Sequence, residues 1–175
     1  MIRTICLHGP ESTGKSTLIP RLADHFGTTW VPEFGRTYAE ERGTAFTMDD
    51  LVTIARTHDA MTAETLATGA APVFLDTDPL MTAVWADMLF GRRDPWFDGW
   101  HATADLYLLL DTDLPWIDDG TRMFGTEAER QRFFDLSRAE LERRGVEYAV
   151  VGGTGEARFE NALAAIADAC LSPSA

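Results

Sequence analysis

Short apolar runs, rich in β-branched and aromatic residues, alternate along the chain with segments of helical periodicity. Two of the runs, residues 73–75 and 106–110, are continuously apolar, as burial on both faces of a parallel sheet requires. Strands are predicted at residues 2–8, 28–32, 72–76, 105–110 and 146–151. Because helical segments separate the strands, the pattern predicts an α/β fold with a five-stranded parallel sheet between two layers of helices.

Capping signals mark where two of the helices begin. Thr47 with Asp50, and Thr126 with Glu129, have the spacing of capping boxes, so a helix is expected after each pair. Pro20 falls in the second turn of the helix predicted after the first strand, where it removes a backbone amide. We expect a kink there.

Two segments lack a regular period. Residues 90–100 are aromatic and irregular, and residues 111–125 combine proline, glycine and charge, so both are predicted to be loops. The length of 175 residues is that of one domain, which is expected to occupy residues 1–171. The tail at 172–175 is expected to be disordered.

The composition excludes several classes of partner. With 15 basic against 28 acidic residues, the net charge of -13 is a poor basis for binding nucleic acid. No segment approaches the ~18 consecutive apolar residues of a membrane span, and the apolar start of the chain is too short for a signal peptide. We therefore expect a cytoplasmic protein that binds neither nucleic acid nor membrane. Cys6 and Cys170 have neither disulfide-framework nor zinc-site spacing and are expected to be small buried side chains.

A glycine-rich motif follows the first predicted strand. Residues 9–16, Gly-Pro-Glu-Ser-Thr-Gly-Lys-Ser, match the G-x-x-x-x-G-K-S/T pattern of a P-loop and precede a helical segment. Lys15 is the only lysine of the chain and would neutralise the β- and γ-phosphates of a nucleotide. The predicted phosphate-binding residues are Gly9, Glu11, Ser12, Thr13, Gly14, Lys15, Ser16 and Thr17.

Acidic residues at the predicted strand ends complete a nucleotide site. Asp76 ends an apolar strand in the manner of a Walker B acid, and with the hydroxyl of Ser16 it is predicted to bind Mg²⁺. In open α/β sheets, ligands bind beyond the carboxyl ends of the strands. Four further acidic residues should therefore face the same cleft: Glu33, Asp78, Asp111 and Asp113.

A P-loop indicates nucleotide binding and leaves the reaction open. Guanine-specific GTPases need an Asn-Lys-x-Asp motif, which a chain with no lysine beyond Lys15 lacks. A nucleic-acid translocase disagrees with the acidic charge, and the length leaves little room for the second domain of an AAA+ ring subunit. A small-molecule kinase or a nucleotide-gated switch remains. Arg122 favours the kinase, because it lies where a lid over residues 112–126 would bring a cation to the transferred phosphoryl group.

Four segments together resemble a known family. Residues 9–17, 31–38, 75–78 and 115–122 are similar to the ribosylnicotinamide kinase domain of the NadR family. The resemblance implies a P-loop nucleotide-kinase fold, a three-layer α/β/α sandwich. It also implies ATP-dependent phosphorylation of the 5′-hydroxyl of nicotinamide riboside to give nicotinamide mononucleotide. The adenylyltransferase and repressor activities of longer family members are not expected, because the chain starts at its P-loop strand.

The substrate that this resemblance implies carries a pyridinium, which an acidic cleft with an aromatic wall would bind by charge and by cation–π contact. Glu33 and Phe34 follow the second strand and Trp116 lies on the predicted lid. The predicted substrate contacts are Glu33, Phe34, Arg36, Asp78 and Trp116. Arg36 is expected to contact phosphate or to hold Glu33. A carboxylate must orient the attacking hydroxyl and accept its proton, and either Glu33 or Asp78 is expected to do so.

Lys15, Glu33, Asp78 and Arg122 are thus the predicted catalytic side chains, with ATP and Mg²⁺ as cofactors. Two alternatives stay open: a kinase for another nucleoside or deoxynucleoside, and a non-catalytic binding module that responds to nucleotide. His58 lies on an apolar helix stripe and is expected to be a packing histidine with satisfied nitrogens. The tryptophans expected to anchor the core or loops are Trp30, Trp85, Trp96 and Trp100.

Overall fold

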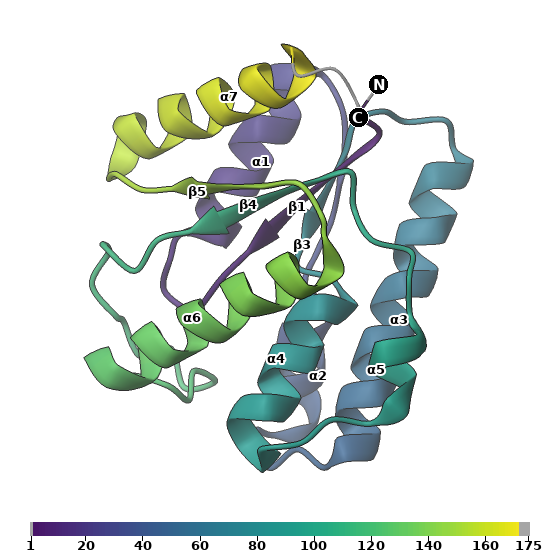
Figure 1. Ribbon diagram of the computed structural model, residues 1–175, viewed down its shortest axis with the longest axis vertical. Coiled ribbons are helices and arrows are strands. Elements are labelled where there is room, and N and C mark those ends of the chain that lie inside the picture. Colours follow the sequence, from purple (N-terminus) through teal and green to yellow (C-terminus); the bar gives the residue numbers. More distant parts are fainter. Residues whose placement is uncertain (1, 172–175) are drawn as a thin grey trace.

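A five-stranded parallel sheet forms the centre of the molecule (Figure 1). The computed structural model describes residues 2–171, so the predicted tail at 172–175 lies outside the described residues. The strand order is β2-β3-β1-β4-β5, and all neighbouring pairs are parallel, which confirms the predicted sheet. The strands are β1 (Thr4–His8), β2 (Trp30–Val31), β3 (Val73–Asp76), β4 (Leu106–Leu110) and β5 (Tyr148–Val151).

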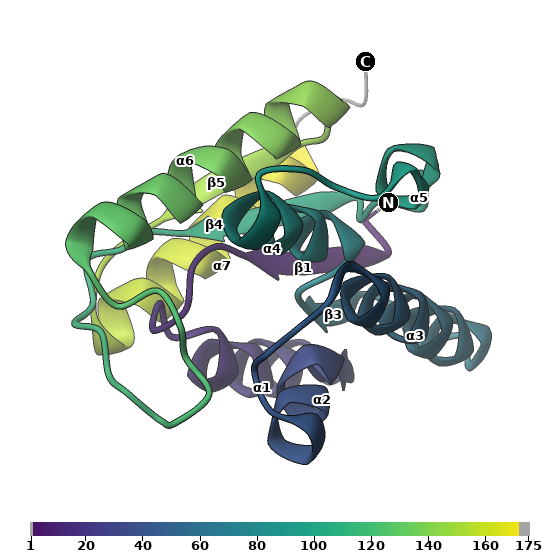
Figure 2. The same cartoon turned by 90° about the horizontal axis from the view of Figure 1, so that it is seen from below.

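Helices cover both faces of this sheet, as Figure 2 shows. Helices α1 and α7 pack on one face, and α3, α4 and α6 contribute side chains to the core on the other. The fold is therefore the expected three-layer α/β/α sandwich. The helices are α1 (Lys15–Phe26), α2 (Phe34–Arg42), α3 (Met48–Ala67), α4 (Pro79–Phe90), α5 (Pro95–Gly99), α6 (Glu127–Arg144) and α7 (Gly155–Leu171).

The central strands contribute side chains to both helical layers. In β4, Leu106, Leu108 and Leu110 pack with α1 and α7, whereas Tyr107 and Leu109 pack with α4 and α6. All five side chains are buried. Burial on both faces explains why this run is continuously apolar, and it confirms the prediction of a central strand.

Side-chain caps fix the starts of the two longest helices. Thr47 Oγ1 accepts a hydrogen bond from the backbone N–H of Asp50, whose carboxylate accepts one from the N–H of Thr47. The same reciprocal pair joins Thr126 and Glu129 at the start of α6. Both predicted capping boxes are confirmed. Helix α1 continues through Pro20.

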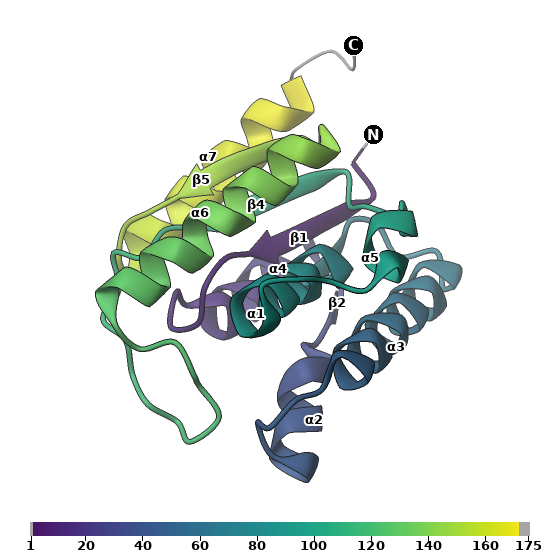
Figure 3. The same ribbon diagram turned by 60° about the horizontal axis from the view of Figure 1, so that its bottom comes forward.

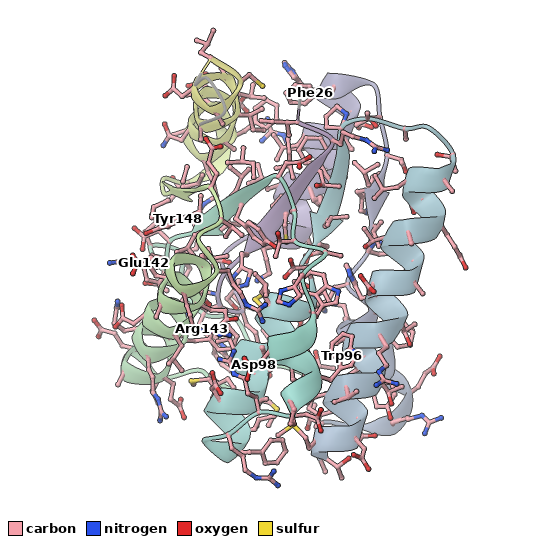
Figure 4. The ribbon with its side chains drawn as sticks, turned by 45° about the vertical axis from the view of Figure 1, so that its right-hand side comes forward. Phe26, Trp96, Asp98, Glu142, Arg143 and Tyr148 are labelled. Atoms are coloured by element: carbon pink, nitrogen blue, oxygen red, sulfur yellow. The ribbon has the colours of Figure 1, made fainter. Side chains whose placement is uncertain are left out.

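The segment at residues 90–100, predicted to be a loop, contains the short helix α5. Arg144 of α6 donates a hydrogen bond to the carbonyl of Trp100 at 2.6 Å. Arg143 pairs with Asp98 of α5 at 3.0 Å, and both side chains are labelled in Figure 4. These arginines come from a helix more than 40 residues later in the chain. The periodicity of residues 90–100 alone could therefore not predict the contacts that hold this segment in place.

The second strand, Trp30 and Cys170 differ from expectation. Residues 28–32, predicted to be a strand, form only the two-residue edge strand β2. Trp30, expected to anchor the core or a loop, lies at this edge and is 39% exposed. Helix α2 follows β2 directly. Cys6 is buried in β1 as expected, but Cys170 is exposed near the end of α7. An edge strand and the last turn of a helix leave one side open to solvent, which an apolar pattern alone does not indicate.

The segment between β4 and α6 is irregular, as predicted, and projects beyond the carboxyl ends of the strands (Figure 3). We call residues 112–126 the lid. Arg130, buried in the first turns of α6, donates a hydrogen bond to the carbonyl of Leu114 at 2.8 Å. This contact fixes the base of the lid against α6.

A buried carboxylate joins α6 to the segment that follows α4. Glu140 is 3% exposed and accepts hydrogen bonds from Arg93 at 2.8 Å, from Arg143 at 2.8 and 3.0 Å, and from Arg144 at 2.9 Å. Burial opposes ionisation of Glu140, but these hydrogen bonds outweigh it and lower the pKa to about 2. The ionised carboxylate therefore stabilises the folded state.

We expect Glu140→Gln to destabilise the protein by about 3 kcal/mol, because three guanidinium groups lose their shared counter-charge. Urea denaturation at pH 7 measures this loss, and Glu64→Gln at an exposed position of α3 is the matched control. The folded pKa lies below the reference value of 4.5, so the advantage of the wild type is complete above that pH and declines as the pH falls toward 2. An advantage equally large at pH 7 and pH 3 would contradict this assignment.

Candidate active site

The P-loop connects β1 to α1 and needs glycine at two positions. Gly14 has a φ of +84° at the N-cap of α1. Gly9 has a φ of +124°, and a Cβ there would lie 2.9 Å from the carbonyl oxygen of Leu110. Only glycine adopts both conformations without strain. The loop therefore ends at a helix N-terminus whose free N–H groups and dipole favour phosphate.

The side chain of Lys15 is folded over this loop. Its Nζ donates hydrogen bonds to the carbonyls of Gly9 at 2.9 Å and Pro10 at 2.7 Å. Burial lowers the pKa of Lys15, although the nearby carboxylates of Glu33 and Asp76 act in the opposite direction. Phosphate oxygens would form stronger, charge-assisted bonds to this ammonium than the two carbonyls do.

Two carboxylates lie near this lysine at the ends of β2 and β3. Glu33 occupies the N-cap position of α2, but its side chain makes no capping hydrogen bond and lines the cavity. Asp76 is buried, and its Oδ1 has no hydrogen-bond partner. Burial and the charge of Glu33 raise the pKa of Asp76 to about 7, against the effect of Lys15.

The residues present fit a magnesium ion. Mg²⁺ prefers oxygen ligands and binds through one or two carboxylates together with phosphates and water. Ser16 presents an exposed hydroxyl in the first turn of α1, and it lines the cavity. The unpartnered Oδ1 of Asp76 is the kind of buried oxygen that a divalent cation would satisfy.

Asp78 lies in a different environment from Asp76. Its Oδ1 accepts a hydrogen bond from the N–H of Leu80 at 2.9 Å, and its Oδ2 accepts one from the hydroxyl of Tyr107 at 2.5 Å. Burial raises the pKa of Asp78 to about 6. Like Asp76, Asp78 is absent from the residues that line the cavity, and so are Asp111 and Asp113. Of the four further acidic residues predicted to face the cleft, Glu33 alone lines it. The carboxylate of Asp78 instead caps α4 and joins that helix to β4.

The lid is docked on the P-loop. Ser12 Oγ accepts a hydrogen bond from the N–H of Ile117 at 3.1 Å. The carboxylate of Glu11 accepts bonds from the N–H groups of Met123 at 3.0 Å and Phe124 at 3.4 Å. Burial raises the pKa of Glu11 while these two N–H groups oppose the shift. Two side chains of the phosphate loop therefore hold the two arms of the lid.

Two arginines meet at Asp119 of the lid. Arg36 of α2 pairs with it at 3.0 Å and Arg122 at 3.2 Å. Both arginines line the cavity. Arg122 thus lies at the site, as the sequence predicts, and also makes a lid ion pair. Arg36, which was expected to contact phosphate or to hold Glu33, makes its ion pair with the lid.

One cavity joins the P-loop, the lid and helices α2, α3 and α4. All eight residues predicted to bind phosphate line it. Its apolar wall consists of Ala39, Phe46, Leu51, Ile54, Met81 and Trp85. Neither Phe34, which packs on Tyr38, nor Trp116, which lies against Gly125, lines it.

The aromatic wall expected from Phe34 and Trp116 is therefore formed by Phe46 and Trp85 instead. Trp85 lies in the middle of α4, between apolar residues that face the core. The period of such a helix indicates burial and does not separate core positions from cavity positions. The only available signal was the position of α4 directly after the strand that ends in Asp76.

Comparison with known proteins agrees with this arrangement. Residues 4–158 match a family model described as an AAA domain. The chain belongs to the AAA domain family. The match begins in β1 and ends in α7, so it includes the whole sheet, the P-loop and the lid. Within residues 2–171, no helix is both long and apolar enough to cross a membrane.

The similar proteins include several named NadR. The chain is 31% identical over 156 residues to the trifunctional NAD biosynthesis/regulator protein NadR of Escherichia coli (strain K12), which covers 86% of this chain and 38% of that protein. A structure of NadR in complex with NR has a TM-score of 0.80 at 26% identity, over 95% of this chain and 51% of that chain. NadR in complex with NAD and AMP-PNP has a TM-score of 0.78 at 24% identity, over 99% of this chain and 51% of that chain. The expected resemblance to the NadR family is confirmed, although this chain spans well under half the length of the curated relative.

We expect Asp76→Asn to raise the stability of the nucleotide-free protein at pH 8 by about 1–2 kcal/mol, because it removes a buried charge. The folded pKa is raised from 3.8 to about 7, so ionisation lowers the stability of the wild type as the pH rises through this window. Thermal unfolding without Mg²⁺ at pH 5 and pH 8 measures the effect, with Asp24→Asn on the exposed side of α1 as control. Equal stabilisation at the two pH values would show that the charge of Asp76 is not its cause.

Proposed function

We propose that this protein is a kinase that transfers the γ-phosphoryl group of ATP to the 5′-hydroxyl of nicotinamide riboside, which gives nicotinamide mononucleotide. The observation that carries the proposal is one cavity in which a P-loop, a docked lid and an aromatic-walled pocket that contains Glu33 meet. The likeness to a NadR structure in complex with NR, over 95% of this chain, supports the choice of substrate. The proposal concerns one reaction only, because the chain spans 38% of a relative described as trifunctional.

Phosphoryl transfer depends on positioning and charge more than on covalent chemistry. Lys15 exchanges its two carbonyl partners for phosphate oxygens, and Arg122 brings a second cation to the transferred group from the lid. Ser16 and Asp76 would hold Mg²⁺, which would supply positive charge to the phosphates. The docked lid excludes water from the cavity and so limits hydrolysis of ATP.

Glu33 is the carboxylate that orients the attacking hydroxyl and accepts its proton. It lines the cavity beside Lys15, and its side chain has no structural hydrogen bond to the helix that it precedes. Both oxygens of Asp78, by contrast, accept hydrogen bonds within the fold. What each carboxylate contacts thus favours Glu33 over Asp78, the two candidates that the sequence left open.

The charge and shape of the cavity suit a flat cation. Glu33 places negative charge in the cavity at the end of β2, and Phe46 and Trp85 add aromatic surface to the wall. A pyridinium would be attracted by this carboxylate and by the face of an indole ring. An uncharged pyrimidine base would gain neither of these electrostatic contacts.

The test of the proposed function is ADP release from ATP and Mg²⁺ in the presence of nicotinamide riboside, uridine, cytidine and deoxynucleosides at equal concentration. We expect turnover that depends on nicotinamide riboside and is lost in Lys15→Met, because the variant lacks the ammonium that binds the phosphates. Preference for another nucleoside would replace this proposal by the alternative nucleoside kinase. Tight nucleotide binding without turnover on any acceptor would favour the nucleotide-responsive binding module.

We expect Glu33→Gln to lower kcat by at least about 100-fold with little change in stability, since it removes the proton acceptor from an unstrained position. Asp78→Asn should instead destabilise the fold by about 1–3 kcal/mol and keep kcat within a few-fold at a permissive temperature, because it disturbs a buried cap. Steady-state kinetics and thermal unfolding of both variants measure the two effects. The reverse pattern would make Asp78 the base.

A further inference from the structure

Thr77 is a buried threonine whose backbone conformation is unfavourable for its side chain. It directly follows β3, is 6% exposed and has a φ of +73°. A β-branched residue rarely adopts a positive φ, whereas glycine does so without strain. Backbone strain of this kind persists only where the surrounding structure imposes it, and it is concentrated at active sites. A threonine at this position therefore indicates that its side chain has a role that glycine could not fill.

The hydroxyl of Thr77 faces the cavity, which this residue lines. Within residues 2–171, no group of the protein forms a hydrogen bond with its Oγ1, and this atom is not enclosed. His58 also lines the cavity, but its two ring nitrogens are enclosed as well as unpartnered, so the expectation of satisfied nitrogens is wrong and no ligand in the cavity reaches them. Polar groups on buried side chains nearly always have partners. The accessible, unpartnered hydroxyl of Thr77 therefore points to a ligand.

The sheet order places Thr77 between the P-loop and Glu33. Strand β3 lies between β2, which Glu33 follows, and β1, which the P-loop follows. Thr77 is the second residue after Leu75, just as Glu33 is the second after Val31, and Leu75 and Val31 are paired in register on strands about 4.8 Å apart. On the other side, the N–H of Thr77 donates a hydrogen bond to the carbonyl of Leu7 at 3.2 Å, just before the P-loop. Thr77 is thus flanked by the phosphate site and by the proposed proton acceptor.

We propose that Thr77 is a further catalytic residue, whose hydroxyl donates a hydrogen bond to an oxygen of the transferred γ-phosphoryl group. The inference rests on the proposed kinase function. In that reaction the attacking oxygen forms a bond to the γ-phosphorus, the bond from this phosphorus to the β–γ bridging oxygen breaks with its electron pair leaving on ADP, and the proton of the attacking hydroxyl passes to Glu33. The phosphoryl group thus moves from the P-loop toward Glu33, past Thr77. A hydroxyl held in place there stabilises the negative charge on its oxygens in the transition state.

The test compares Thr77→Val, which keeps the shape of the side chain, with Thr77→Ser, which keeps the hydroxyl. With nicotinamide riboside, ATP and Mg²⁺, we expect Thr77→Val to lower kcat about 10- to 100-fold, as loss of one donor to a developing charge implies. The KM values for riboside and ATP and the Mg²⁺ concentration for half-maximal activity should stay within about twofold, and Thr77→Ser should recover most of kcat. The unfolding temperature of Thr77→Val should match the wild type, because the fold does not use the hydroxyl. Thr53→Val, at an exposed position of α3 outside the cavity, is the matched control.

An unchanged kcat in Thr77→Val, or a loss confined to a KM or to the Mg²⁺ requirement, would overturn the inference and leave the proposed function intact. Wild-type turnover in Thr77→Gly, which relieves the backbone strain and removes the hydroxyl, would overturn it as well.

If the wild type does not turn over nicotinamide riboside, the proposed function fails. Calorimetry of Mg²⁺ and ADP with aluminium fluoride, a mimic of the transferred phosphoryl group, then decides the role of Thr77. We expect the wild type to bind this complex about 10-fold more tightly than Thr77→Val, while the two bind Mg²⁺ and ADP alone equally, because the contact is to the transferred group. Equal affinities for the aluminium fluoride complex overturn the inference.

Discussion

The site depends on negative charge buried beside a single ammonium. Lys15, the only lysine of the chain, bonds two backbone carbonyls, while Asp76 keeps one buried oxygen without a partner and has a pKa raised to about 7. Each arrangement is less favourable than a charge-assisted contact would be. A magnesium nucleotide offers an anion to the lysine and a cation to the carboxylate together. In the proposed kinase, binding of nucleotide and of metal would thereby be coupled through the same few atoms at the ends of β1 and β3.

The P-loop also determines where the lid lies. Glu11 and Ser12, two residues inside the phosphate-binding loop, hold backbone N–H groups at both arms of the lid. The lid in turn carries Asp119, which pairs with Arg36 on α2. The contacts thus run from the P-loop through the lid to α2. A change of P-loop conformation on nucleotide binding would reach the acceptor side of the cavity through this path.

The sequence predicts those parts of the structure that depend on residues close together in the chain or on burial of both faces of a strand. The P-loop is specific because Gly9 must have a positive φ and no Cβ beside Leu110, and β4 is recognisable because both of its faces are buried. Helix α5 and the partners of Asp78 depend on residues far away in the chain, such as Arg144 and Tyr107, and no local pattern reports them. The part played by Phe46 and Trp85 in the cavity wall was missed for another reason, because positions such as Trp85 share the helical period of the core.

The charges of the cavity are separated in space, and this separation bears on which acceptor the proposed kinase would prefer. Arg36 and Arg122 meet at the lid, whereas Glu33 and Asp76 lie at the ends of β2 and β3. The anionic phosphoryl group would then move between Lys15 and Arg122, and a cationic acceptor would rest on the acidic side. An uncharged nucleoside of the same size would fit the same walls but lose this attraction, and at a short distance in a poorly solvated cavity such a loss is large. Charge more than shape would therefore separate a pyridinium riboside from the pyrimidine nucleosides.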